Sequence, residues 1–183
     1  LTELGSIKIN KEERTKMYKT IPRSSVIGFL IGVLPGAGAT IASFLAYGME
    51  RNVVSDEEKE KFGKGSVNGL SAPETANNAA CSGSFVPMLT LGIPGSGTTA
   101  VMLGALLGFG VQPGPRLYMT NPEIFWSIIM SMYIGMVILL ILNLPLIPYI
   151  ARILAVPKNY LIPLILFFSV TGIYVMSFNN FDI

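Results

Sequence analysis

The chain has 183 residues, of which 51% are hydrophobic and only 13% charged, and its formal net charge is +2. Soluble domains carry roughly 25% charged residues, so the composition argues against a soluble globular domain. Histidine is absent and Cys81 is the single cysteine, which excludes Ser-His catalysis and an internal disulfide within this sequence and argues against a zinc or haem site. The small net charge gives no indication of nucleic-acid binding.

The charged residues are clustered, and four long stretches between them carry no charge: residues 24–49, 75–115, 124–151 and 159–181. A helix needs ~20 mostly apolar residues to cross a bilayer, and each stretch reaches that length. The alternative, a buried helical core in a large soluble protein, would leave too little polar surface. We therefore predict an all-α, polytopic transmembrane protein.

Taken in chain order, residues 1–23 are a basic lead-in and residues 50–64 a second charged block. Lys and Arg concentrate in cytoplasmic loops, so both blocks are predicted to be cytoplasmic. Residues 24–49 would then enter the membrane and return as a first broken or re-entrant helix pair. In the second block, Ser55 and Glu58 have the spacing of a capping box, which predicts a short helix ending at Gly63.

Residues 66–110 are predicted to hold a polar island and a second broken helix pair. Residues 122–151 and 159–178 should be two plain transmembrane helices, the first starting at Asn121-Pro122 and kinked by Pro145 and Pro148. The sequence does not start with methionine, and we expect residues 1–183 to be one membrane domain within a longer protein.

A Pro-Gly element occurs twice, as LPGAGAT at residues 34–40 and IPGSGTT at residues 93–99. A proline followed by two glycines cannot continue an ordinary helix, and broken backbone survives in lipid only when buried in protein or lining a wet cavity. The start of the following helix presents unpaired N–H groups that suit an anion, and paired broken helices indicate a transporter's binding site. The predicted substrate-binding residues are Gly36, Ala37, Gly38, Thr40, Gly95, Ser96, Gly97, Thr98 and Thr99.

Two other interpretations of these glycines remain open. Gly28, Gly32 and Gly36, like Gly104 and Gly108, have the spacing of close helix crossings, so packing is the favoured role of these outer glycines and an alternative role for those of the Pro-Gly elements. Residues 92–99 also approach a phosphate-binding loop, but Thr98 stands where that motif needs lysine.

The polar island holds Glu74, Asn77, Asn78 and Cys81, which would share one face of a helix. Intramembrane ionisable residues are candidates for function, so Glu74, Asn77 and Asn78 are predicted to bind a coupling cation or to orient the substrate. Alternatively, Ser71 and Glu74 form a capping box, in which case Glu74 only closes the start of a helix.

Together these residues resemble the large membrane subunit of the tripartite tricarboxylate transporters, the TctA family, over nearly all of residues 20–183. The resemblance rests on GVLPGAG at 32–38, FGKG at 62–65, APE at 72–74, NN at 77–78, LGIPGS at 91–96, TA at 99–100, GxQPGP at 110–115 and NLP at 143–145. It implies that the chain is the second of two homologous halves of a multi-pass protein of the bacterial inner membrane.

The resemblance also implies a non-enzymatic transporter that takes up citrate or another carboxylate on a sodium or proton gradient, without ATP and without a cofactor. The implied partners are a small membrane subunit and a periplasmic solute-binding protein. A membrane scaffold, or a membrane enzyme with its catalytic residues outside this sequence, remains an alternative.

Overall fold

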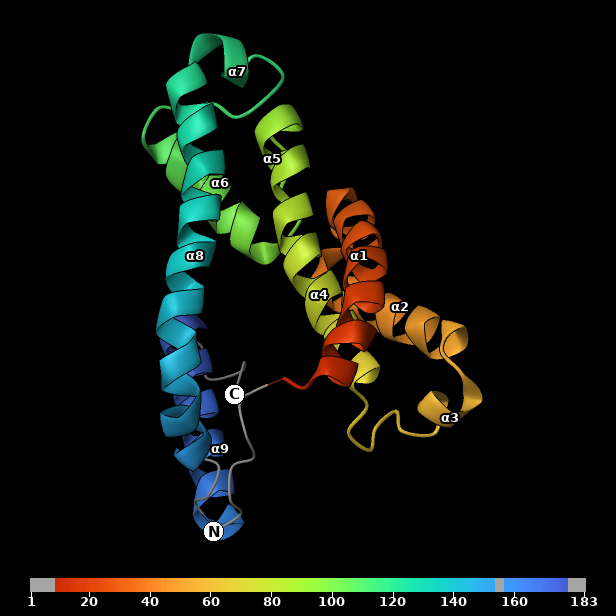
Figure 1. Ribbon diagram of the computed structural model, residues 1–183. Helices are drawn as coiled ribbons and strands as arrows, with labels where there is room; N and C mark the ends of the chain where they lie inside the picture. The colour runs from red at the N-terminus through yellow and green to blue at the C-terminus, as the bar shows by residue number, and fades with distance from the viewer. Residues whose placement is uncertain (1–8, 154–156, 178–183) are drawn as a thin grey trace. The chain divides into compact units, whose positions relative to one another are not determined.

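The computed structural model describes residues 9–153 and 157–177, and every regular element in these ranges is a helix (Figure 1). The all-α prediction is therefore confirmed for the described residues. They fall into two units, one ending at Met130 and the other starting at Ser131. The helices are α1 (Lys11–Val33), α2 (Gly38–Val53), α3 (Asp56–Lys59), α4 (Val67–Gly83), α5 (Phe85–Leu91), α6 (Gly97–Gly108), α7 (Leu117–Thr120), α8 (Pro122–Ile153) and α9 (Lys158–Ser177).

Helices α1, α2 and α4 pack together through small residues spaced four apart. On α1 the stripe is Thr20, Ser24, Gly28 and Gly32; on α4 it is Asn68, Ala72, Ala76 and Ala80; on α2 it is Ala42, Ala46 and Glu50. All these residues are buried. A four-residue step keeps side chains on one helix face, and small side chains let two backbones approach closely.

The α1 and α4 stripes run parallel in one constant register. A methyl group added at Gly28 would overlap the backbone of Ala76, and one added at Gly32 would overlap the backbone of Ala80. The Asn68 amide donates to the Thr20 hydroxyl in the same register. The packing role expected for Gly28 and Gly32 is therefore confirmed. It is not found for Gly36 or Gly104, where an added methyl group meets nothing within 4 Å.

The short helix expected after Ser55 is present as α3, with Ser55 as its N-cap residue, but it ends at Lys59 and not at Gly63. The predicted capping box is wrong, because Ser55 makes no side-chain cap and the Glu58 carboxylate accepts from Ser66 instead. The alternative start at Ser71 is also wrong. Ser71 lies inside α4, where its hydroxyl donates to the Val67 carbonyl, and the N-cap of α4 is Ser66. Polar residues at capping-box spacing also occur within helices, where their hydroxyl groups bond to the preceding turn.

Helix α1 begins at Lys11, well inside the predicted polar lead-in, and runs through Pro22 without a break. Asn10 and Glu13 form a capping box at its start. Lys and Glu are good helix formers, so a helix can continue from a charged segment into an apolar one. The end of the charged block is therefore not a helix boundary.

A second apolar cluster lies where α5, α7 and the start of α8 meet. Its buried members are Met88, Leu89, Val111 and Leu117, with Phe125 among the partly buried residues packed against them. The turn at Gly110–Pro115 is held there because the Gly114 N–H donates to the Leu89 carbonyl.

One described helix is long and apolar enough to cross a membrane: residues Pro122–Ile150, with a mean hydropathy of 2.4 over its most apolar window and no part of that window buried. Helix α8 continues through Pro145 and Pro148. Shorter apolar helices occur at Gly97–Gly108 and Asn159–Val175. The end of the predicted helix at residue 178 lies outside the described residues.

Candidate functional site

The first Pro-Gly element breaks the chain between α1 and α2. Gly36 and Gly38 have φ values of 80° and 70°, which glycine adopts without the strain other residues would incur. Ala37 precedes α2 and provides no side-chain cap, so the N-cap residue does not bond to the N–H groups of the first α2 turn. Thr40 is exposed in that turn.

The second element breaks the chain between α5 and α6 by a different backbone route. Here the left-handed residue is Gly92, with a φ of 70°, and neither Gly95 nor Gly97 has a positive φ. Ser96 caps α6: its hydroxyl accepts from the Thr99 N–H at 3.2 Å, and the Thr99 hydroxyl accepts from the Ser96 N–H at 2.8 Å. Thr99 is thus buried in a capping role, whereas Gly97 and Thr98 are exposed in the first turn.

Gly83 and Ser84 connect the two breaks. A methyl group added at Gly83 would lie 2.6 Å from the Phe29 carbonyl oxygen and 3.2 Å from Gly32, just before the first break. One added at Gly95, in the second break, would lie 2.9 Å from the Ser84 side chain. The α1 end and the second break therefore pack on adjacent residues of the α4–α5 junction.

Glu74, Asn77 and Asn78 lie on one exposed face of α4. The Asn78 amide nitrogen donates to the Glu74 carbonyl, and the Cys81 thiol lies 3.7 Å from the Asn77 amide oxygen. Glu74 lines a cleft of about 770 Å³ with Met17 among others, and no residue of either Pro-Gly element lines that cleft. This cleft therefore does not bring Glu74 together with either break.

Sequence reasoning missed a buried polar cluster between α1, α2 and α4, here named the Glu50 cluster: Thr20, Arg23, Ser24, Glu50 and Asn68. The Glu50 side chain is fully buried. Its Oε1 accepts from the Thr20 hydroxyl at 2.8 Å, from Arg23 Nη2 at 2.8 Å and from Asn68 Nδ2 at 3.0 Å. A buried carboxylate needs such partners, because burying an unpaired charge is costly.

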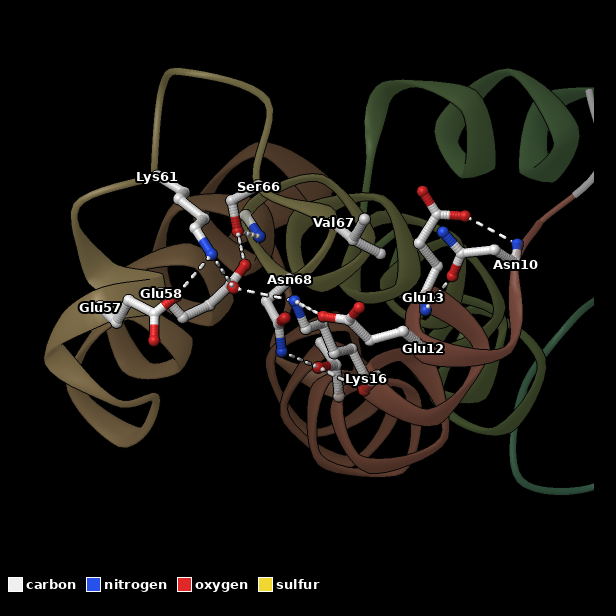
Figure 2. A network of polar contacts seen from close by, with 12 residues as sticks. Asn10, Glu12, Glu13, Lys16, Glu57, Glu58, Lys61, Ser66, Val67 and Asn68 are labelled. Carbon is white, nitrogen blue, oxygen red and sulfur yellow. Dashed lines mark hydrogen bonds and ion pairs between the residues drawn. The ribbon is translucent and has the colours of Figure 1, made fainter. Parts of the chain in front are cut away.

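A second cluster, around Glu58, fastens α3 to α1 and α4. Glu58 accepts from Lys16 Nζ at 3.0 Å and from the Ser66 hydroxyl at 2.8 Å (Figure 2). Burial alone would raise the pKa of Glu58, but the hydrogen bonds from Ser66 and Lys16 outweigh it and the pKa is lowered. The pKa of Lys16 is raised by its hydrogen bonds to Glu12 and Glu58.

The sequence does contain a signal for the Glu50 cluster. Each small-residue stripe ends in a polar residue at the same four-residue step: Thr20 on α1, Glu50 on α2 and Asn68 on α4. The prediction that Glu50 belongs to a charged loop did not take this pattern into account.

A long exposed apolar helix, close packing through small residues and two helix breaks are features of a membrane transport protein. The comparison with protein families is specific. Residues 2–183 match the model of the tripartite tricarboxylate transporter TctA family, and the chain belongs to that family, as predicted.

Two relatives from Agrobacterium vitis are similar to the chain. An "uncharacterized 52.8 kDa protein in TAR-I ttuC' 3'region" is 41% identical over 175 residues, which cover 96% of this chain and 34% of the relative. An "uncharacterized protein in TAR-II ttuC' 3'region" is 44% identical over 156 residues, which cover 85% of this chain and 64% of the relative. The chain thus spans less than two thirds of either relative, and no solved structure matches it.

Proposed function

We propose that this chain is part of the permease subunit of a secondary active carboxylate transporter of the bacterial inner membrane, driven by a sodium or proton gradient. The observation that carries the proposal, beside the family membership, is the presence of two helix breaks, of which the second packs on Ser84 next to the contact that the end of α1 makes with Gly83, just before the first break. Broken helices of this kind form the binding sites of many secondary transporters. A periplasmic solute-binding protein would deliver the substrate, and a small membrane subunit would complete the multi-pass complex.

In this proposal the first turns of α2 and α6 bind substrate carboxylates through backbone N–H groups and the exposed hydroxyls of Thr40 and Thr98. A helix N-terminus carries roughly half a positive charge, which suits an anion where no Lys or Arg lies in either element. Glu74, Asn77 and Asn78 would orient the substrate or assist the coupling ion from the exposed face of α4.

The test is uptake of labelled citrate and dicarboxylates by the complete complex in liposomes, with an imposed sodium or proton gradient and no ATP. Thr98→Ala should lower uptake at least tenfold, the size of losing an interaction with charged substrate. Thr90→Ala, which removes an exposed hydroxyl on α5, is the matched control and should transport normally. Glu74→Gln and Asn78→Ala should also reduce uptake.

Two results would count against the proposal. Absence of uptake under either gradient, with an intact complex, would reject carboxylate transport as the activity. Normal uptake by both Thr40→Ala and Thr98→Ala would reject the assignment of substrate to the Pro-Gly elements and favour a packing role for their glycines.

A further inference from the structure

The Glu50 cluster holds four buried polar atoms with no hydrogen-bond partner among the described residues: Glu50 Oε2, Asn68 Oδ1, Ser24 Oγ and Arg23 Nε. Glu50 and Ser24 are fully buried and Asn68 is 5% exposed. Native proteins pair most buried polar groups, so each unpaired one calls for an explanation, such as an ion. Three of these four atoms are oxygens, and they come from three different helices.

The orientation of the Asn68 amide is fixed by its neighbours. Its Nδ2 donates to the Glu50 carboxylate at 3.0 Å, and a flipped amide would set two oxygens against each other there. Oδ1 is therefore an acceptor without a donor, like Glu50 Oε2. The two oxygens belong to the two side chains that this hydrogen bond joins. Ser24 follows Thr20 by one turn on the same buried face of α1.

We propose that the Glu50 cluster binds a monovalent metal cation such as Na⁺, with Glu50 Oε2, Asn68 Oδ1 and Ser24 Oγ as its protein ligands. Carboxylate, amide and hydroxyl oxygens are the ligands that hard cations prefer. The single carboxylate favours a monovalent over a divalent ion. Among the described residues, no group of three His, Cys, Asp or Glu side chains could hold a metal.

Arg23 makes the cation site weaker but does not occupy it. Its guanidinium pairs with Glu50 Oε1, whereas the proposed ligand is the other oxygen, and the Arg23 side chain is 37% exposed and thus partly screened by water. Glu50 would then bridge two cations. A cleft of about 470 Å³ lies against the cluster, with Arg23 and Asn68 in its lining together with Lys16, Lys19, Glu57 and Glu58.

The binding test uses the complete subunit purified in detergent. Bound radioactive sodium and the thermal unfolding midpoint are measured as NaCl replaces choline chloride at constant ionic strength. Ser24→Ala should weaken sodium binding on the order of tenfold or more, the loss seen when metal sites lose even an outer partner. In choline its midpoint should equal or exceed that of the parent, because it removes an unpaired buried hydroxyl. Ser25→Ala is the matched control, since Ser25 is outside the cluster.

Two further variants keep the test decisive if the cluster is also needed for folding. Glu50→Gln should lose sodium binding, whereas Arg23→Gln removes the competing charge and should bind sodium at least as tightly as the parent. If the cluster is purely structural, Arg23→Gln should bind no more sodium than the other variants. Sodium should then also leave its unfolding midpoint unchanged. Equal sodium affinity in the parent, Ser24→Ala and Glu50→Gln would overturn the proposal and assign the unpaired atoms to bound water.

Only the use of this cation in transport rests on the proposed function. Sodium binding that depends on Ser24, without gradient-driven uptake, would support the cation site and reject the proposed function. Sodium-driven uptake in which Ser24→Ala binds sodium like the parent would support the function and reject the site.

Discussion

The close contact between α1 and α4 can be tested with one methyl group. In Gly28→Ala, the new Cβ would overlap the carbonyl oxygen and the Cα of Ala76. The obstacle is backbone, which cannot turn aside as a flexible side chain would, so the two helices must separate along the stripe. Overpacking a well-packed site costs about 1–3 kcal/mol, and this site is at the upper end of that range.

Alanine is also the better helix former, by about 1 kcal/mol, which offsets part of the cost. We therefore expect Gly28→Ala to lower the free energy of unfolding by about 2 kcal/mol, or the midpoint by roughly 4–8 °C for a domain of this size. The assay is thermal unfolding of the complete subunit in detergent. Gly48→Ala is the control, because its Cβ meets nothing within 4 Å inside α2, and its midpoint should stay the same or rise.

The identity of the obstructing atoms provides a sharper test. Shrinking the facing residue in Gly28→Ala/Ala76→Gly removes a side chain but leaves the backbone of Ala76 in place, so the double variant should not recover. Recovery would mean that side chains, and not backbones, set the spacing of the two helices. A Gly28→Ala midpoint equal to that of the parent would refute the close contact altogether.

Two further predictions concern the α3 attachment and the α6 cap. The lowered pKa of Glu58 stabilises the fold above its unfolded value of about 4.5, and this contribution is lost as the pH falls through the lower folded pKa. The unfolding midpoint of Glu58→Gln should therefore fall less steeply than that of the parent below about pH 4.5. The exposed Glu57→Gln should behave like the parent. The same fall in midpoint for the parent and Glu58→Gln would contradict this prediction. Ser96→Ala removes the cap of α6 and should lower the free energy of unfolding by about 1 kcal/mol, measured by chemical unfolding. Ser82→Ala is the control. An unchanged stability of Ser96→Ala would show that the cap is not formed.

The helix breaks could be predicted from the sequence because they are local. A proline followed by two glycines disfavours a continuous helix whatever surrounds it, and both elements do interrupt the chain. The details of each break depend on neighbours. At the second element the left-handed residue is Gly92, where a methyl group would lie 2.8 Å from the Pro113 carbonyl oxygen, a contact set by a loop twenty residues further on.

The Glu50 cluster could not be predicted by the same reasoning. Thr20, Glu50 and Asn68 are far apart in the sequence, and only the register of three packed helices brings them together. Composition placed Arg23 and Glu50 in cytoplasmic segments because charged residues usually mark loops. The burial of Glu50 follows from the four-residue step of small residues, a tertiary signal that hydropathy does not contain.

The α1–α4 contact also constrains how the two proposed sites can communicate. The Glu50 cluster lies at the Thr20 end of the stripe, and the first break follows Gly32 at the other end. At 1.5 Å per residue, these ends are roughly 20 Å apart along α1. A cation at Glu50 therefore cannot touch a carboxylate held at Gly36.

Energetic coupling over that distance requires an element that adopts two arrangements, and each ligand must bind one of these arrangements more tightly than the other. Helices α1 and α4 touch through their backbones at Gly28 and Gly32, so this close-packed pair is one connection between the two ends. A second connection is α2 itself, which starts at Gly38 beside the first break and carries Glu50 near its other end. The α1–α4 stripe and helix α2 are thus the two helical connections between these sites.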